Sequence, residues 1–183
     1  MAQFDVLPVN QIAGKATMDS MPVRCRSCGV RDTALCASLG DGELSALHDI
    51  GRRRIIPAGQ VVSWAGDPNA ICANIVRGVL KVTASMADGR EQIVGLLYTE
   101  NFVGQLFAEE SSLTVIALTE TDLCCYSRTS FDHVLDDFPR LERMLLKRTM
   151  SSLNDARERM LRLGRQNAQE RVAGFILDVA LRE

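Results

Sequence analysis

The sequence predicts a mainly β fold with helices at its end, namely a β-sandwich or barrel followed by a long helix. Between residues 54 and 126, short apolar or alternating segments are separated by turn signals, a pattern typical of all-β domains. After Pro139, apolar residues recur at intervals of three and four, which is helical spacing. With 183 residues and 46% hydrophobic content, the chain can bury one core with a smaller appendage.

The elements follow from local patterns. Residues 41–50 suit a short amphipathic helix capped by Asp41, because their apolar residues fall on one side. Asp88-Gly89 predicts a hairpin turn, because this pair tolerates positive φ at both central positions. Strands are expected at residues 54–56, 61–64, 73–76, 79–84, 92–97, 115–117 and 123–126.

The long helix carries a stripe of apolar and small residues that advances by alternating three and four positions, as in a coiled-coil seam. The stripe consists of Leu146, Thr149, Leu153, Ala156, Met160 and Leu163. Other faces carry Leu145 and Leu161, so one face can dock on the barrel while another pairs with a second copy. We therefore expect a homodimer with the stripe at its interface. A last helix is expected to start with a capping box at Asn167-Ala-Gln-Glu170.

Three cysteines near the N-terminus indicate a soft-metal site. They lie in the run Cys25-Arg-Ser-Cys28-Gly-Val-Arg-Asp-Thr-Ala-Leu-Cys36. Two thiolates separated by two residues can bind one metal centre, and the third can close over it if the loop folds back. The fourth ligand would be Cys124 or Cys125, and only one of them, because successive strand residues face opposite sides. Both zinc and an iron-sulfur cluster are compatible with this spacing.

The alternatives to a metal site are less favourable. Residues 1–24 contain no apolar core of a secretory signal, which favours a reducing cytosol and argues against disulfides. Cys72 lies inside an apolar strand and is expected to be a small buried residue. The N-terminal cysteines instead lie among basic residues such as Arg24 and Arg31, which are expected to lower thiol pKa values.

Composition disfavours several classes of protein. The net charge of -2 provides no general attraction to nucleic acid, despite the cluster Arg52-Arg53-Arg54. The apolar runs are too short to cross a bilayer, so no membrane association is expected. The two histidines, His48 and His133, fall in separate predicted helices without a nucleophile motif, so we do not expect an enzyme.

Together with the cysteine cluster, several segments make the chain resemble the CRP/FNR transcription regulators, specifically the oxygen-sensing FNR branch with its alphaproteobacterial FnrL- and FnrN-like members. The segments are Gly59-Gln-Val-Val-Ser-Trp-Ala-Gly66-Asp67, Arg77-Gly78, Asp88-Gly89-Arg-Glu-Gln-Ile-Val-Gly95, Asn101-Phe-Val-Gly104, Ala117-Leu-Thr-Glu-Thr-Asp-Leu-Cys124 and Leu163-Gly-Arg-Gln-Asn167-Ala-Gln-Glu-Arg171. The resemblance implies a 4Fe-4S cluster held by Cys25, Cys28, Cys36 and Cys124. Cys36 follows Cys28 after seven residues, as in the alphaproteobacterial members.

The resemblance also implies a domain order. Residues 1–40 would form the cluster-binding arm, 41–138 a jelly-roll, cyclic-nucleotide-binding-like sensory domain, 139–165 the dimerisation helix, and 166–183 the first helix of a truncated helix-turn-helix domain. The expected function is that of a cytoplasmic, oxygen-responsive transcriptional regulator. DNA and RNA polymerase are expected partners of the full-length protein, but not of this chain alone. The alternative is a structural zinc-binding or cluster-free interaction module.

Cyclic nucleotides are not expected as ligands. Relatives that bind them hold the phosphate with a Gly-Glu pair and a later arginine. Here the pair is Gly104-Gln105, and no Lys or Arg occurs between Arg90 and Arg128.

Overall fold

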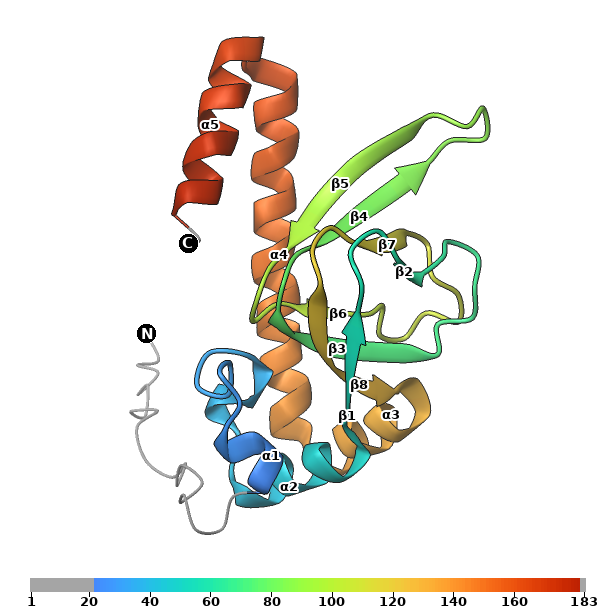
Figure 1. The fold of residues 1–183 in the computed structure, drawn as a ribbon, viewed down its shortest axis with the longest axis vertical. Helices are drawn as coiled ribbons and strands as arrows, with labels where there is room; N and C mark the ends of the chain where they lie inside the picture. The colour runs from blue at the N-terminus through green and yellow to red at the C-terminus, as the bar shows by residue number, and fades with distance from the viewer. Residues whose placement is uncertain (1–21, 182–183) are drawn as a thin grey trace, which may run out of the picture. The chain divides into compact units, whose positions relative to one another are not determined.

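The computed structural model describes residues 22–181 (Figure 1). The strands are β1 Arg52–Ile56, β2 Val61–Ser63, β3 Ile71–Arg77, β4 Leu80–Ser85, β5 Glu91–Leu97, β6 Phe102–Val103, β7 Thr114–Ala117 and β8 Thr121–Ser127. The helices are α1 Val23–Arg26, the 3-10 helix η1 Leu35–Ser38, α2 Asp41–Ile50, α3 Arg128–Asp137, α4 Pro139–Arg165 and α5 Ala168–Ala180. The chain forms two compact units, Met1–Leu141 and Glu142–Glu183.

The strands form two antiparallel four-stranded sheets, in the orders β1-β8-β3-β6 and β2-β7-β4-β5 (Figure 1). Apolar side chains from both sheets meet in one core. Its buried members are Ile56, Ala73, Ile75, Leu80, Val103, Val115, Ala117, Leu123 and Cys125. This arrangement is a jelly-roll, and it confirms the predicted fold class, including the long helix that follows the strands as α4.

The hairpin between β4 and β5 was predicted correctly, but its turn differs in detail. The backbone N–H of Met86 donates to the Arg90 carbonyl at 2.8 Å, so five residues make the connection. Gly89 has the expected positive φ of 86°, whereas Asp88 is not among the described residues with positive φ. The Asp88 carboxylate instead accepts the backbone N–H of Arg90 at 3.1 Å. The predicted two-residue turn with two positive φ angles was therefore wrong.

Of the two predicted helix starts, that of α2 was wrong in detail and that of α5 is confirmed. The N-cap of α2 is Gly40 and not Asp41, and the backbone N–H of Gly40 donates to the Glu43 carboxylate at 2.8 Å. The predicted capping box of α5 is present, since Asn167 Oδ1 accepts the Glu170 N–H at 3.0 Å and the Glu170 carboxylate accepts the Asn167 N–H at 2.8 Å. β6 was missed because a two-residue strand has too few residues to show alternation.

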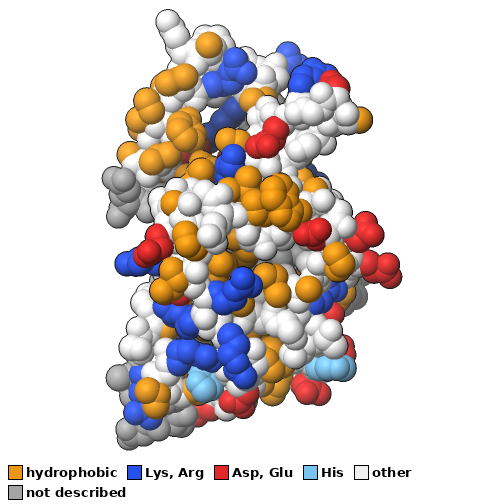
Figure 2. Space-filling model, turned by 45° about the vertical axis from the view of Figure 1, so that its right-hand side comes forward, with side chains coloured by type: hydrophobic (Ala, Val, Ile, Leu, Met, Phe, Trp, Pro, Cys, Tyr) orange, Lys and Arg blue, Asp and Glu red, His pale blue; other side chains and the backbone are white. Residues whose placement is uncertain are grey.

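The C-terminal unit leaves much of its apolar surface uncovered, as the upper part of Figure 2 shows. Within it, Arg162 and Asp178 form a salt bridge of 2.5 Å between α4 and α5. No helix within residues 22–181 has both the length and the apolar character required to cross a bilayer.

Candidate metal centre

The alternation of side chains along β8 decides which of its two cysteines can face a metal. Leu123 and Cys125 point into the barrel core. Cys124 and Tyr126 point to the opposite face of the same sheet. Cys124 therefore lies outside the core, facing the N-terminal segment.

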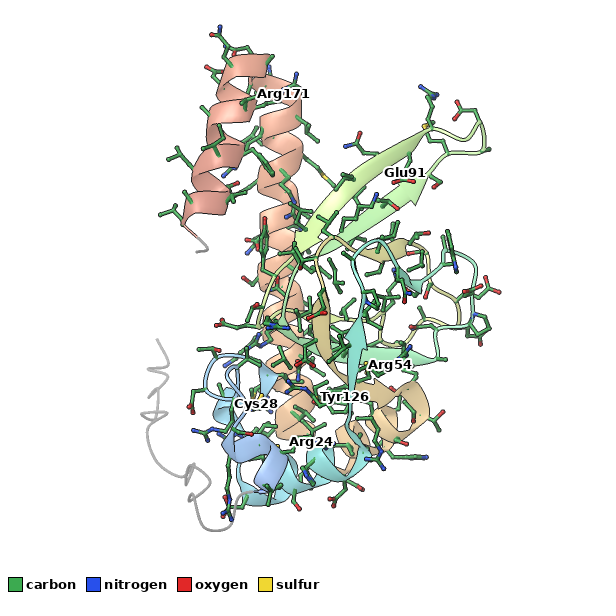
Figure 3. The ribbon with its side chains drawn as sticks, viewed as in Figure 1. Arg24, Cys28, Arg54, Glu91, Tyr126 and Arg171 are labelled. Atoms are coloured by element: carbon green, nitrogen blue, oxygen red, sulfur yellow. The ribbon has the colours of Figure 1, made fainter. Side chains whose placement is uncertain are left out.

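The N-terminal segment brings the other three cysteines to this face. Cys25 lies in α1, Cys28 in the turn that follows, and Cys36 in η1. All three line one cavity of about 30 Å³ together with Cys124. Figure 3 shows Cys28 near Tyr126 and Arg24, which also line this cavity. The structure thus brings the four predicted ligands together and leaves Cys72 and Cys125 outside the cavity.

The segment is held in place by apolar burial and by polar contacts. Its anchoring side chains, each at most 5% exposed, are Val30, Ala34, Leu35 and Leu39. In addition, Arg24 Nη2 donates to the backbone carbonyl of His48 in α2 at 2.5 Å. These contacts within the protein position the three cysteines without the help of a bound metal.

The two strands that flank β8 supply the immediate neighbours of Cys124. In the strand registers, Arg53 of β1 and Asn74 of β3 both lie opposite Cys124. Arg53 Nε donates to Asp122 at 2.8 Å and therefore keeps its guanidinium beside the cysteine. A cation on one side and an amide on the other give Cys124 a polar surrounding, although it sits in the middle of a sheet.

The cavity brings together thiols whose ionised forms repel one another. Burial, followed by the nearby thiols of Cys124 and Cys28, raises the pKa of Cys25 above its ordinary value. Arg24 and Arg31 act in the opposite direction but are outweighed. The expectation that basic neighbours would lower this pKa was therefore wrong, because burial and thiolate repulsion dominate. Such repulsion is relieved when a metal cation binds the thiolates.

The residues present fit a thiolate-bound metal group. No carboxylate lines the cavity, whereas Arg24, Arg31 and Arg53 do. Thiolates without carboxylates suit zinc or an iron-sulfur cluster and disfavour magnesium or calcium. A cluster with four thiolates carries net negative charge, which these arginines complement. Among residues 22–181, no group of three or more His, Cys, Asp or Glu side chains has the arrangement that holds a single metal ion.

Cys72 and Cys125 are buried, and the expectation of an inert, buried Cys72 agrees with this. Burial raises the pKa of Cys72 to about 12 and that of Cys125 to about 11. We expect the metal-free native protein to react with iodoacetamide at the half-buried Cys28 while Cys72 and Cys125 stay unmodified, because burial shields these two thiols and raises their pKa values. Peptide mass spectrometry measures this. Labelling of Cys72 as fast as Cys28 in the folded protein would contradict the assignment of an inert, buried thiol.

A second cavity, of about 160 Å³, lies in the barrel and is lined by Gly104 and Gln105 among others. No side chain that lines it is charged. Gln105 is already engaged, since its amide nitrogen donates to Ser112 Oγ at 2.8 Å and its amide oxygen accepts the Ser112 N–H at 3.0 Å. The absence of cyclic-nucleotide binding remains a prediction.

The predicted dimer stripe lies on α4. The stripe residues Leu146, Leu153, Met160 and Leu163 are between 41% and 69% exposed in the single chain. Apolar side chains this exposed in a row are suited to an interface. Whether a second copy covers them is a prediction.

The sequence did not single out two further cavity residues, Asn74 and Tyr126. The sequence nevertheless contains a feature that points to each of them. Tyr126 follows Cys124 by two positions in a strand and therefore shares its face. Asn74 is a polar residue in the middle of the apolar segment 71–76. Both residues are only 2% exposed.

Comparisons with known proteins agree with this fold. Residues 53–138 match the family model of the cyclic nucleotide-binding domain. The structure of FixK2 from Bradyrhizobium japonicum superposes with a TM-score of 0.66 at 24% identity, over 70% of this chain and 65% of that one. Residues 53–138 therefore match a cyclic nucleotide-binding domain, and the chain shares the fold of FixK2.

The more similar sequences are transcriptional activators. A probable transcriptional activator of Rhizobium leguminosarum is 39% identical over 85% of this chain and 65% of its own length. The transcriptional activator protein FnrL of Cereibacter sphaeroides is 38% identical over 87% of this chain and 64% of its own length. The chain thus spans slightly less than two thirds of the relatives that it matches.

Proposed function

We propose that this chain is the sensory and dimerisation part of an oxygen-responsive transcriptional regulator. In this proposal Cys25, Cys28, Cys36 and Cys124 hold a 4Fe-4S cluster. The observation that carries the proposal is the convergence of these four thiols, from two distant parts of the sequence, on one cavity bordered by arginines. The relatives named as transcriptional activators support the regulatory part.

The placement of the ligands suggests how a signal leaves the site. Three ligands belong to the N-terminal segment and one to β8, so a group bound to all four joins the segment to the barrel. When bound, the cluster would supply iron that molecular oxygen can oxidise, and the four thiolates would hold it between the segment and the barrel. β8 ends at Ser127, α3 starts at Arg128, and α4 starts at Pro139. Cys124 is therefore close in sequence to the proposed dimer helix, so a change in its ligation can affect that helix.

In the full-length regulator, DNA and RNA polymerase are the proposed partners, and the dimer is the form that binds DNA. The cluster would then favour the dimer under low oxygen. A coupling of about 1 to 3 kcal/mol between the cluster and the dimer would change the dimer dissociation constant by roughly one to two decades.

Sedimentation tests this function. We expect the dissociation constant of the anaerobic dimer to rise by roughly one to two decades after air exposure, as the visible absorption bleaches. The control is the Cys124→Ser variant, whose dimer dissociation constant should not change on exposure to air. If bleaching occurs with an unchanged dissociation constant, the dimer helix is not the switching element.

A further inference from the structure

A buried pair of polar side chains lies directly behind two of the four thiols. Asn74 Nδ2 donates to the Tyr126 hydroxyl at 3.2 Å and lies 3.9 Å from Cys36 Sγ, within hydrogen-bonding range for sulfur. Tyr126 lies two residues after Cys124 on the same face of β8, and both line the cavity. Asn74 therefore joins Cys36 of the N-terminal segment to Tyr126, which shares its face of the barrel with Cys124.

The fold fixes this pair in place. Asn74 lies opposite Cys124 in the β3–β8 ladder, and Tyr126 follows Cys124 on the same face of β8. The Tyr126 ring packs against Phe131 with 5.3 Å between ring centroids, which holds the hydroxyl toward the cavity.

Folding alone does not account for Asn74. Its side-chain oxygen is buried and has no hydrogen-bond partner. A buried polar atom without a partner destabilises the folded state, whereas an apolar side chain of similar size would not. The amide contributes N–H donors at this position, and they are directed at the Cys36 thiol and at the Tyr126 hydroxyl.

We propose that Asn74 and Tyr126 are positioning residues that donate hydrogen bonds to the thiolates of Cys36 and Cys124 when these ligate a metal group. The inference rests on the proposed function, because it assigns these residues to the same site. Hydrogen bonds to ligand sulfur disperse thiolate charge, and their effect is strongest where water is excluded. They favour the more negative, reduced form of a cluster and so raise its reduction potential.

Two variants remove the donors with little change of shape. Tyr126→Phe deletes one hydroxyl and keeps the ring contact with Phe131. Asn74→Leu removes the amide together with its unpartnered oxygen. We expect both variants to lower the reduction potential of the one-electron cluster couple in an anaerobic dye-mediated titration. We also expect iron release to a chelator, measured without oxygen, to be roughly threefold to tenfold faster, the factor that one hydrogen bond contributes.

The matched control is Tyr98→Phe, which makes the same chemical change at the chain's other tyrosine, away from the cavity. It should behave as wild type in both measurements. Urea unfolding of the metal-free Asn74→Leu protein distinguishes a positioning role from a structural one, because we expect its midpoint to be equal to or higher than that of wild type.

Three outcomes decide the inference. Lower potentials and faster iron release in Tyr126→Phe and Asn74→Leu, with an unaltered Tyr98→Phe, support it. Wild-type values in both variants overturn it and leave the proposed function intact, because the wild-type cluster is then present. A wild-type protein that binds no cluster overturns the proposed function and this inference together.

Discussion

Replacing any one of Cys25, Cys28, Cys36 or Cys124 with Ser is expected to abolish assembly of the cluster. A serine hydroxyl is a poor substitute for a thiolate at iron, and the cavity offers no carboxylate to take its place. Iron content, acid-labile sulfide and visible absorption of anaerobically reconstituted protein measure the effect. In each variant these values should fall to background.

The control is Cys72→Ser, because Cys72 is a cysteine of the same chain that does not line the cavity. It should retain the wild-type absorption and iron content. A wild-type spectrum in any of the four cavity variants would remove that residue from the ligand set. Loss of the spectrum in Cys72→Ser, with the fold intact by circular dichroism, would contradict the proposed division of the cysteines.

Leu153→Glu is expected to convert the dimer into a monomer. Leu153 is 41% exposed in the single chain and lies in the middle of the stripe on α4. At a two-fold axis, a carboxylate placed there would be buried close to its own symmetry mate, with a cost on the order of several kcal/mol. Ala156→Glu should weaken the dimer for the same reason. Analytical ultracentrifugation under anaerobic conditions measures both effects.

The matched control is Ser151→Glu, which introduces the same carboxylate on the same helix. At 100° per residue, position 151 lies on the face of α4 opposite the stripe, and Ser151 is exposed. This variant should remain as dimeric as wild type. Equal dimer fractions in wild type, Leu153→Glu and Ala156→Glu would show that the stripe is not the interface.

The barrel could be predicted from sequence because its strands carry period-two apolar patterns bounded by turn residues. The long helix could be predicted because its period of three and four continues without interruption as far as Gly164. The turn at Asp88-Gly89 and the cap of α2 could not be predicted in detail. Both depend on a hydrogen bond from a backbone N–H to a side-chain carboxylate, from Arg90 to Asp88 and from Gly40 to Glu43, and a backbone N–H is present at almost any residue type.

Only part of the site could be predicted from the sequence. Cysteine spacing identified three thiols and two candidates for the fourth. Strand alternation implied that only one of Cys124 and Cys125 could be a ligand, and the family resemblance selected Cys124. The pKa of Cys25 was predicted in the wrong direction, because burial and the approach of Cys124 are not visible in the local sequence. Asn74 and Tyr126 were not identified, because their importance depends on the register between β3 and β8.

The identity of the bound metal group tests the central claim most directly. Mössbauer spectroscopy of iron-57-labelled wild-type protein, prepared without oxygen, should show a 4Fe-4S cluster. Metal and sulfide analysis should find about four iron and four sulfide per chain. A colourless protein that contains one zinc per chain and no sulfide would contradict the account, and so would a protein that binds no metal at all.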